Sequence, residues 1–151
     1  MSQNDCPLCR RDAAEDVIWH NDRVRIILVA HDLHPGYTRV IWADHVAEMT
    51  QLQASARNEI MNAVWLVEAM QRKVLRPHEV NLAEFGNMVP HVHWHVIPRW
   101  EADPLFPEAI WASAPGRTPQ AIQAWHEEKS RIDALLPVYR EALHGALAAI
   151  R

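Results

Sequence analysis

The sequence predicts one domain in which β-strands and α-helices occupy separate stretches of the chain. Three observations support this prediction. Stretches rich in β-branched and aromatic residues, which are typical of strands, recur before residue 44 and again after residue 78. Between them, near residues 54–75, apolar residues follow a helical spacing. At residues 91–96, histidines alternate strictly with apolar residues, which indicates a half-buried strand.

Composition limits the classes of function. The chain has 151 residues, of which 49% are apolar and 23% charged, as is ordinary for a soluble domain with its own core. A net charge of −4 provides no basic field for nucleic acid. The polar first five residues do not form a signal peptide, and no apolar run approaches the ~20 residues of a membrane helix. We therefore expect a cytoplasmic protein that binds neither nucleic acid nor membranes.

The secondary structure follows from local patterns. Strands are expected at residues 16–20, 24–30, 38–43 and 79–85, in addition to the histidine stretch. A long helix is expected over 54–75, with Thr50 or Ser55 as its N-cap and an apolar stripe that faces the core. The C-terminal part predicts two more helices, at residues 119–130 and 132–150, with Thr118 as the N-cap of the first.

The loop at residues 100–112 is broken by prolines and rich in aromatic residues, so we expect it to be ordered and packed. Its tryptophans Trp100 and Trp111 have two alternative roles. Either they pack in the ordinary way, or one of them stacks on a purine.

Three histidines of the alternating stretch, His91, His93 and His95, are expected on one face of a strand, about 6.5–7 Å apart. Pro98 should end the strand, since it cannot donate to a ladder. Arg99 should then lie at the mouth, where a cation can meet an anionic ligand. Such a ridge suits two chemistries: zinc binding by a His-x-His pair, or nucleophilic catalysis by a central histidine that its neighbours orient.

The stretch from His91 to Ile97 matches, at all seven positions, the motif His-φ-His-φ-His-φ-φ, with φ apolar, of the histidine triad (HIT) superfamily. The chain resembles this family over about residues 6–99, and Pro98-Arg99 resembles its dinucleoside polyphosphate hydrolase (fragile histidine triad) branch. The resemblance implies an α+β fold, with an antiparallel sheet of about five strands and one long helix packed on it, and a homodimer. We expect a HIT domain at 1–112 and a C-terminal helical extension, packed on the same domain, at 113–151.

The resemblance also implies a nucleotidyl hydrolase or transferase. His93 would attack the α-phosphate of a dinucleoside polyphosphate, such as diadenosine tetraphosphate, or of a nucleoside phosphoramidate, and a nucleotidyl-histidine intermediate would form. His95 would donate to the phosphoryl oxygens or the leaving group, and His91 would hold the geometry, without a catalytic cofactor. One alternative is a nucleotide-binding adaptor with little turnover that acts through protein partners. Another, catalytic zinc on all three histidines, is disfavoured because strand neighbours converge poorly on one ion.

Four further residues resemble the family's nucleotide contacts. Asp32 and Leu33 stand where the family holds the ribose hydroxyls and lines the base pocket. Asn87 stands in place of a glutamine whose amide reaches the phosphates, and Asn81 matches an asparagine near the phosphate. Their alternative roles are ordinary, since an aspartate often begins a turn and a strand asparagine is often exposed. Tyr37 replaces a histidine that often joins the hydrogen-bond network of the triad; a tyrosine can donate there but carries no charge at pH 7.

The only two cysteines, Cys6 and Cys9, form a Cys-x-x-Cys pair. In a reducing compartment this is a redox pair, half of a zinc site or two free thiols. A redox pair usually opens a helix after a strand, and no strand precedes this one. HIT proteins with an N-terminal Cys-x-x-Cys bind structural zinc, and the resemblance implies Cys6, Cys9, His45 and His91 as the four ligands. Such zinc would tie the N-terminus to the histidine strand and fix the orientation of His91.

Overall fold

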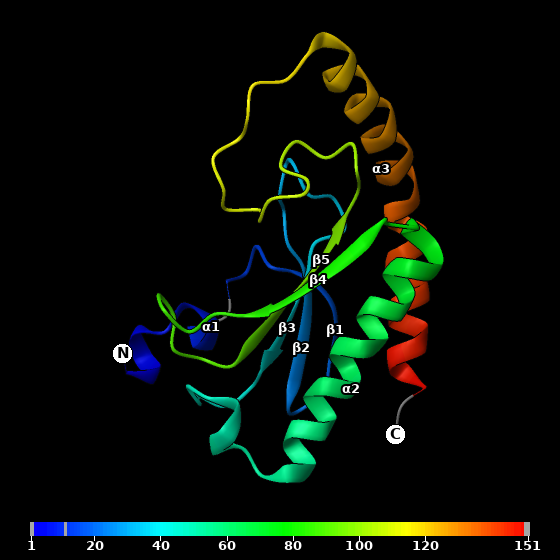
Figure 1. Ribbon diagram of the computed structural model, residues 1–151. Coiled ribbons are helices and arrows are strands. Elements are labelled where there is room, and N and C mark those ends of the chain that lie inside the picture. Colours follow the sequence, from blue (N-terminus) through cyan, green and yellow to red (C-terminus); the bar gives the residue numbers. More distant parts are fainter. Residues whose placement is uncertain (1, 11, 150–151) are drawn as a thin grey trace.

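The computed structural model describes residues 2–10 and 12–149 and contains one five-stranded antiparallel sheet, with strand order β1-β2-β3-β5-β4 (Figure 1). Neighbouring strands pair antiparallel throughout. The α+β class and the strand-bearing stretches are therefore confirmed. The strands are β1 (Asp16–His20), β2 (Val24–Leu28), β3 (Thr38–Trp42), β4 (Glu79–Glu84) and β5 (His93–Arg99).

Two long helices pack against one another beside the sheet (Figure 1). They are α2 (Ala54–Met70), which a π-helical turn η3 (Gln71–Leu75) continues, and α3 (Pro119–Ala148). The short elements are η1 (Gln3–Asp5), α1 (Pro7–Arg10) and η2 (Met49–Gln51). Within residues 2–10 and 12–149, no helix combines the length and the apolar character that crossing a bilayer requires.

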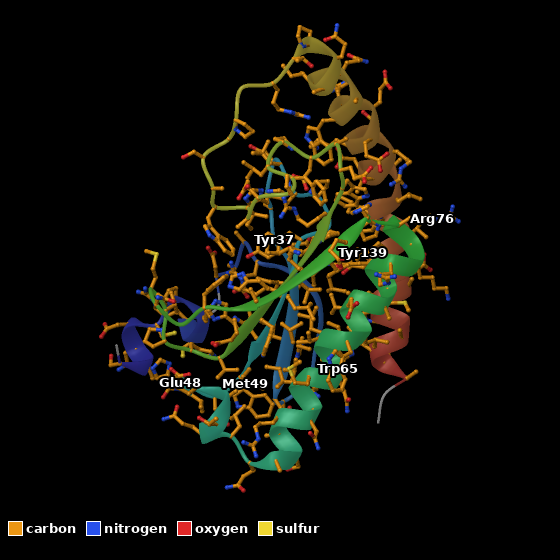
Figure 2. The ribbon with its side chains drawn as sticks, viewed as in Figure 1. Tyr37, Glu48, Met49, Trp65, Arg76 and Tyr139 are labelled. Atoms are coloured by element: carbon orange, nitrogen blue, oxygen red, sulfur yellow. The ribbon has the colours of Figure 1, made fainter. Side chains whose placement is uncertain are left out.

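Helix α2 turns its apolar stripe to the core as predicted, since Ile60 and Val64 are fully buried, whereas Trp65 is 54% exposed on its outer side (Figure 2). Both predicted N-caps are wrong. The N-cap is Gln53, and its side chain makes no capping hydrogen bond. Thr50 lies instead in η2, because the chain makes a separate 3₁₀ turn before α2 begins.

The two helices predicted after residue 118 are one continuous helix, so this prediction is wrong. Helix α3 continues through Arg131, where the prediction separated the two helices, and also through Pro137, where one backbone N–H is missing. Tertiary packing compensates for the lost hydrogen bond, because Tyr139 two residues later is fully buried. The Thr118 N-cap is confirmed, since its side chain accepts a backbone N–H of the first turn. Ile150, which the prediction included, lies outside the described residues. Helix α3 packs on α2, η3 and β1, and the division of the chain at residue 112 stays a prediction.

Strand β5 continues through Pro98, so the prediction that this proline ends the strand is wrong. On one side Pro98 pairs with Val80 of β4. On the other side Pro98 has no partner in β3, because β3 begins at Thr38, which pairs with Val96. Pro98 therefore lies where β5 has an unpaired edge, and sheets tolerate proline at such an edge.

The prediction that Arg99 meets an anionic ligand at the mouth of the strand is also wrong, because its side chain is buried in an ion pair. Its side chain is 2% exposed and forms an ion pair with Asp103, at 2.8 Å from Nε to Oδ2 and 3.1 Å from Nη2 to Oδ1. It also donates to the amide oxygen of Asn81 at 3.0 Å and to the carbonyl of Glu108 at 2.8 Å. Burial alone would raise the pKa of Asp103, but hydrogen bonds from Arg99 and a backbone N–H hold it below its usual value.

Replacing Asp103 with alanine is expected to lower the free energy of unfolding by about 3–5 kcal/mol, because it leaves the buried guanidinium of Arg99 without its carboxylate. Asp133→Ala is a matched control. It breaks the ion pair with Lys129, which has the same i,i+4 spacing but is 34% and 44% exposed, so it should cost less than about 1 kcal/mol. Urea denaturation measures both, and equal losses would contradict the structural role given to Asp103.

Candidate functional site

His93 and His95 open β5, and their rings lie side by side with centroids 4.8 Å apart. The alternating Val92 and Val96 are fully buried in the core, as predicted. His91 was expected on the same strand but lies before it. The backbone turns there, with the His91 N–H donating to the carbonyl of residue 89 at 2.8 Å. The structure therefore brings two of the three histidines together on the strand.

The tautomer of His93 follows from one contact. Its Nδ1 lies 2.6 Å from the carbonyl oxygen of His91. A carbonyl only accepts, so Nδ1 carries the proton and Nε2 keeps its lone pair. Burial lowers the pKa of His93, and the nearby charge of Arg39 acts in the same direction against the hydrogen bond to His91. His93 is therefore a neutral imidazole with a nucleophilic nitrogen.

His95 has the opposite tautomer. The hydroxyl of Tyr37 is hydrogen-bonded to Nδ1 of His95, and Nη2 of Arg39 lies 3.4 Å from the same hydroxyl. A guanidinium only donates, so the tyrosine oxygen accepts from Arg39, and we assign the hydroxyl proton to the hydrogen bond with Nδ1 of His95. The proton of His95 is then on Nε2, which is buried and has no hydrogen-bond partner among the described residues. Burial, with Arg39 and His93 nearby, lowers the pKa of His95 to about 3.

The turn before β3 places Tyr37 at the centre of the molecule (Figure 2). Gly36 has a φ of 82°, and a Cβ there would lie 2.5 Å from Cδ1 of Leu75. The buried amide of Gln71 donates to the carbonyls of Gly36 and Val96, at 3.0 Å each. The turn is thus fixed against both η3 and β5, which holds the tyrosine hydroxyl against His95.

A cavity of about 620 Å³ lies over the two histidines. Asn87 lines it, so this predicted contact residue does lie beside His93 and His95. The two loop tryptophans differ. Trp100 is 4% exposed and packs near Trp125, whereas Trp111 is 65% exposed and lines the cavity. The other residues that line this cavity are Pro7, Leu8, Arg39, Phe85, Met88 and Val89.

Asp32 lines a second cavity, which has a volume of about 470 Å³. Leu33 is 38% exposed and does not belong to its lining. Helix α3 contributes Lys129 and Asp133 to this cavity, and Arg39 belongs to the walls of both cavities. Asn81, by contrast, lines neither one, and its amide oxygen is taken by Arg99.

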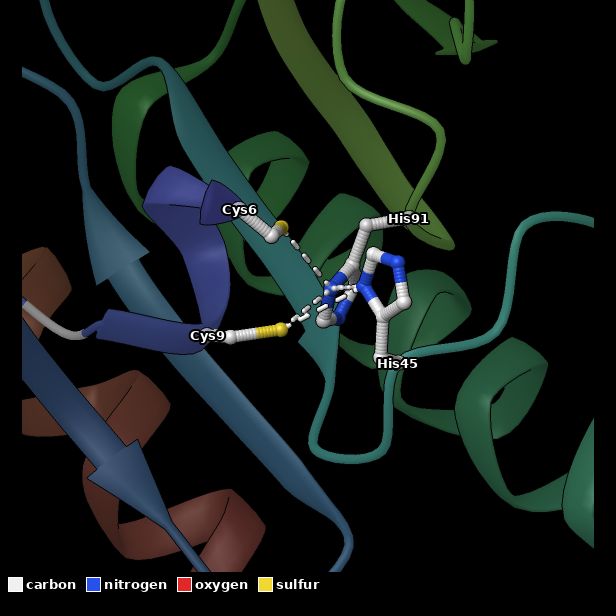
Figure 3. A group of neighbouring side chains, drawn as sticks. All are labelled: Cys6, Cys9, His45 and His91. Carbon is white, nitrogen blue, oxygen red and sulfur yellow. Dashed lines mark hydrogen bonds between the residues drawn. The ribbon is translucent and has the colours of Figure 1, made fainter. Parts of the chain in front are cut away.

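Four side chains converge beside the N-terminal turn (Figure 3). The ligand atoms of Cys6, Cys9, His45 and His91 all lie within 4.8 Å of one another. Nδ1 of His91 is 3.5 Å from the sulfur of Cys6, 3.4 Å from that of Cys9 and 3.4 Å from Nδ1 of His45. A tetrahedral zinc with ordinary bond lengths places sulfur and nitrogen about 3.6 Å apart and two nitrogens about 3.3 Å apart. The three distances from His91 match this geometry, and the donor set of two thiols and two imidazoles fits a zinc ion.

The orientation of His91 suits a metal ligand. Its Nε2 lies 2.7 Å from the carbonyl oxygen of Trp42 and must donate to it, so Nδ1 presents its lone pair to the cysteines. Helix α1 carries Cys9, and within residues 2–10 no strand precedes it, whereas a preceding strand is the usual context of a redox Cys-x-x-Cys.

A family model for the HIT domain matches residues 10–102. The chain belongs to the HIT family. It is 25% identical over 93 residues to an uncharacterized HIT-like protein of Saccharolobus solfataricus, which covers 58% of this chain and 67% of the relative. It is 27% identical over 103 residues to AP-4-A phosphorylase of Mycobacterium tuberculosis, which covers 64% of this chain and 53% of that enzyme. The chain thus matches about half the length of the phosphorylase.

Solved HIT structures share the fold. A histidine triad protein from Sinorhizobium meliloti superposes with a TM-score of 0.63 at 20% identity, over 89% of this chain and 100% of the other. A Zn-bound histidine triad family protein from Mycobacterium smegmatis has a TM-score of 0.55 at 19% identity, over 88% and 99%.

The HIT motif does not point to Arg39, which the structure places directly opposite His95 in the register of β3 and β5. Its guanidinium has no acidic partner within ion-pair distance in the described part of the chain, and its Nε is buried without a hydrogen bond. The signal was a charged residue inside the apolar strand Thr38–Trp42. That signal alone could not place it beside His95, because the pairing of two strands far apart in the sequence was not known.

The Tyr37→Phe variant is expected to change the tautomer of His95, because Nδ1 loses its hydrogen-bond donor. In the wild-type protein, ¹⁵N NMR should show the Nε2–H form of His95, and in the variant a mixture of both tautomers. His93 provides an internal control, since its tautomer depends on the His91 carbonyl. An unchanged His95 spectrum would contradict the proton positions derived above.

Proposed function

We propose that this HIT-family chain is a nucleotidyl hydrolase or transferase that acts on the α-phosphate of nucleotide substrates. Dinucleoside polyphosphates such as diadenosine tetraphosphate are the favoured class, and nucleoside phosphoramidates are the second. The observation that carries the proposal is the hydrogen bond from Nδ1 of His93 to the His91 carbonyl, which leaves a nucleophilic Nε2 beside a cavity. The similarity to AP-4-A phosphorylase supports the favoured class.

In the proposed reaction, the lone pair of Nε2 on His93 forms a bond to the α-phosphorus. The bond from phosphorus to the leaving oxygen breaks, and its electron pair leaves with that oxygen. Nε2–H of His95 hydrogen-bonds this oxygen or a phosphoryl oxygen, and the amide of Asn87 assists it. Water then attacks phosphorus, the P–N bond breaks, and the nucleoside monophosphate departs with His93 restored. Positioning and charge stabilisation supply most of the rate.

The nucleoside contacts are proposed from the second cavity. The carboxylate of Asp32 accepts from the two ribose hydroxyls, and Leu33 covers the base when a ligand is present. The amide oxygen of Asn81 accepts a hydrogen bond from Arg99, so only its NH₂ group remains to donate to a phosphate oxygen.

We also propose that Cys6, Cys9, His45 and His91 hold a structural zinc, which contributes to folding and takes no part in the reaction. The cytoplasm, where thiols stay reduced, suits such a site. A homodimer is proposed through β4, which ends the strand order and so has one unpaired edge.

His93→Ala is expected to lower turnover of diadenosine tetraphosphate at least about a thousandfold, because the nucleophile is removed. The activity should survive brief treatment with EDTA, and the matched variant His144→Ala, which removes an exposed histidine of α3, should keep it. Adenosine phosphoramidate, assayed in parallel, identifies the preferred class. Nucleotide binding without turnover would favour the adaptor alternative, and activity lost to EDTA but retained by His93→Ala would contradict the mechanism.

The purified protein is expected to contain one zinc per chain by elemental analysis. His45→Ala should lower the zinc affinity at least about tenfold and the melting temperature by several degrees, because one of four ligands is lost. Exposed His126 on α3 supplies the control variant His126→Ala, which should keep both. Full zinc content in His45→Ala, or a wild-type melting temperature that chelators do not change, would exclude the site.

A further inference from the structure

Arg39 lies between two cavities and has no ion-pair partner among the described residues. It lines the cavity of His93 and His95 and also the cavity of Asp32. Within the same part of the chain its side chain makes one hydrogen bond, the 3.4 Å contact to the hydroxyl of Tyr37, so most of its five N–H donors are uncommitted.

The other arginines near the sheet show what a satisfied guanidinium looks like in this protein. Arg25 is 4% exposed and pairs with Glu15 at 2.9 Å, and Arg99 pairs with Asp103 at 2.8 Å. Arg39 is half-buried, and no carboxylate lies within ion-pair distance of it among the described residues. A half-buried guanidinium without a carboxylate is costly unless an anion completes it, and a planar fork of N–H donors suits two oxygens of one phosphoryl group.

We propose that Arg39 holds the phosphoryl group that is transferred, with the nucleoside in the cavity of Asp32 and the leaving group in the cavity of Trp111. This inference rests on the proposed function. The position of Arg39 supports the inference, because it pairs directly with His95 and lines both cavities. In a substrate that spans the two cavities, the phosphate between them therefore lies beside this guanidinium.

The chemistry of the step gives the guanidinium a defined role. When Nε2 of His93 bonds to phosphorus and the leaving oxygen departs, negative charge is spread over the non-bridging oxygens. Arg39 stays protonated throughout and donates hydrogen bonds to these oxygens, so it exchanges no proton or electron pair. Its contact with Tyr37 fixes the side chain before the substrate binds, which avoids reorganisation during the reaction.

The kinetic test uses Arg39→Leu, Arg39→Lys and the matched control Arg72→Leu, which removes the same charge from an exposed position in η3. Arg39→Leu is expected to lower kcat about 100- to 1000-fold, with a smaller change in KM, and Arg39→Lys should restore part of it. Arg72→Leu should stay within threefold of wild type. The double variant Tyr37→Phe/Arg39→Leu separates direct from indirect action, since Tyr37→Phe alone also disturbs the tautomer of His95. If adding Arg39→Leu to Tyr37→Phe lowers kcat no further, Arg39 acts through the tyrosine and the proposal is wrong.

A binding test does not depend on turnover. Wild type should bind adenosine monophosphate about 10- to 100-fold more tightly than adenosine, measured by calorimetry, because only the nucleotide offers a phosphoryl group. Arg39→Leu should lose most of this difference and keep its affinity for adenosine, which a merely misfolded variant would not.

The two proposals fail in different ways. If His93→Ala abolishes turnover while Arg39→Leu stays within threefold of wild type and still prefers the monophosphate, the role of Arg39 is refuted and the nucleophile stands. If wild type shows no His93-dependent turnover but Arg39→Leu loses the preference for the monophosphate, the phosphoryl site stands and hydrolysis is refuted.

Discussion

The carbonyl oxygen of His91 is the acceptor on which the site depends. It takes the Nδ1 proton of His93 and so leaves the lone pair of the ring on Nε2. Its own position is set by the side chain of the same residue, which is held between the carbonyl of Trp42 and the two N-terminal cysteines. His91, which lies before β5, therefore links the Cys-x-x-Cys turn and β3 to the ring of His93. A displacement of the turn or of β3 would change the hydrogen bond that orients this ring.

The second determinant is the low polarity around the histidines. Burial lowers the pKa of His91, His93 and His95, so all three rings are neutral near pH 7. Neutral rings can have opposite tautomers, and here each tautomer is selected by a different group: a backbone carbonyl for His93 and a tyrosine hydroxyl for His95. Two chemically identical side chains thus become an acceptor and a donor next to each other.

The sequence predicted those features that depend on local pattern and on a specific motif. The strands, the core face of α2 and the convergence of Cys6, Cys9, His45 and His91 agree with the structure. The failures concern contacts over long sequence distances. Arg99 was predicted to meet an anionic ligand at the mouth of the strand, but it forms an ion pair with Asp103, and Arg39 was overlooked because only the pairing of β3 with β5 brings it to His95. The break predicted at residue 131 between two C-terminal helices also failed, because the neighbouring Ile132 is fully buried and α3 continues across it.

Helix α3 connects distant parts of the molecule. Near its beginning it contributes Lys129 and Asp133 to the cavity of Asp32, and further along Arg140 forms an ion pair with Asp16 of the edge strand β1. The residues that shape this cavity are thus partly encoded outside the matched family domain, which ends at residue 102. Substitutions in α3 can therefore change which ligand this cavity prefers while the histidines of β5, and the reaction they perform, stay the same.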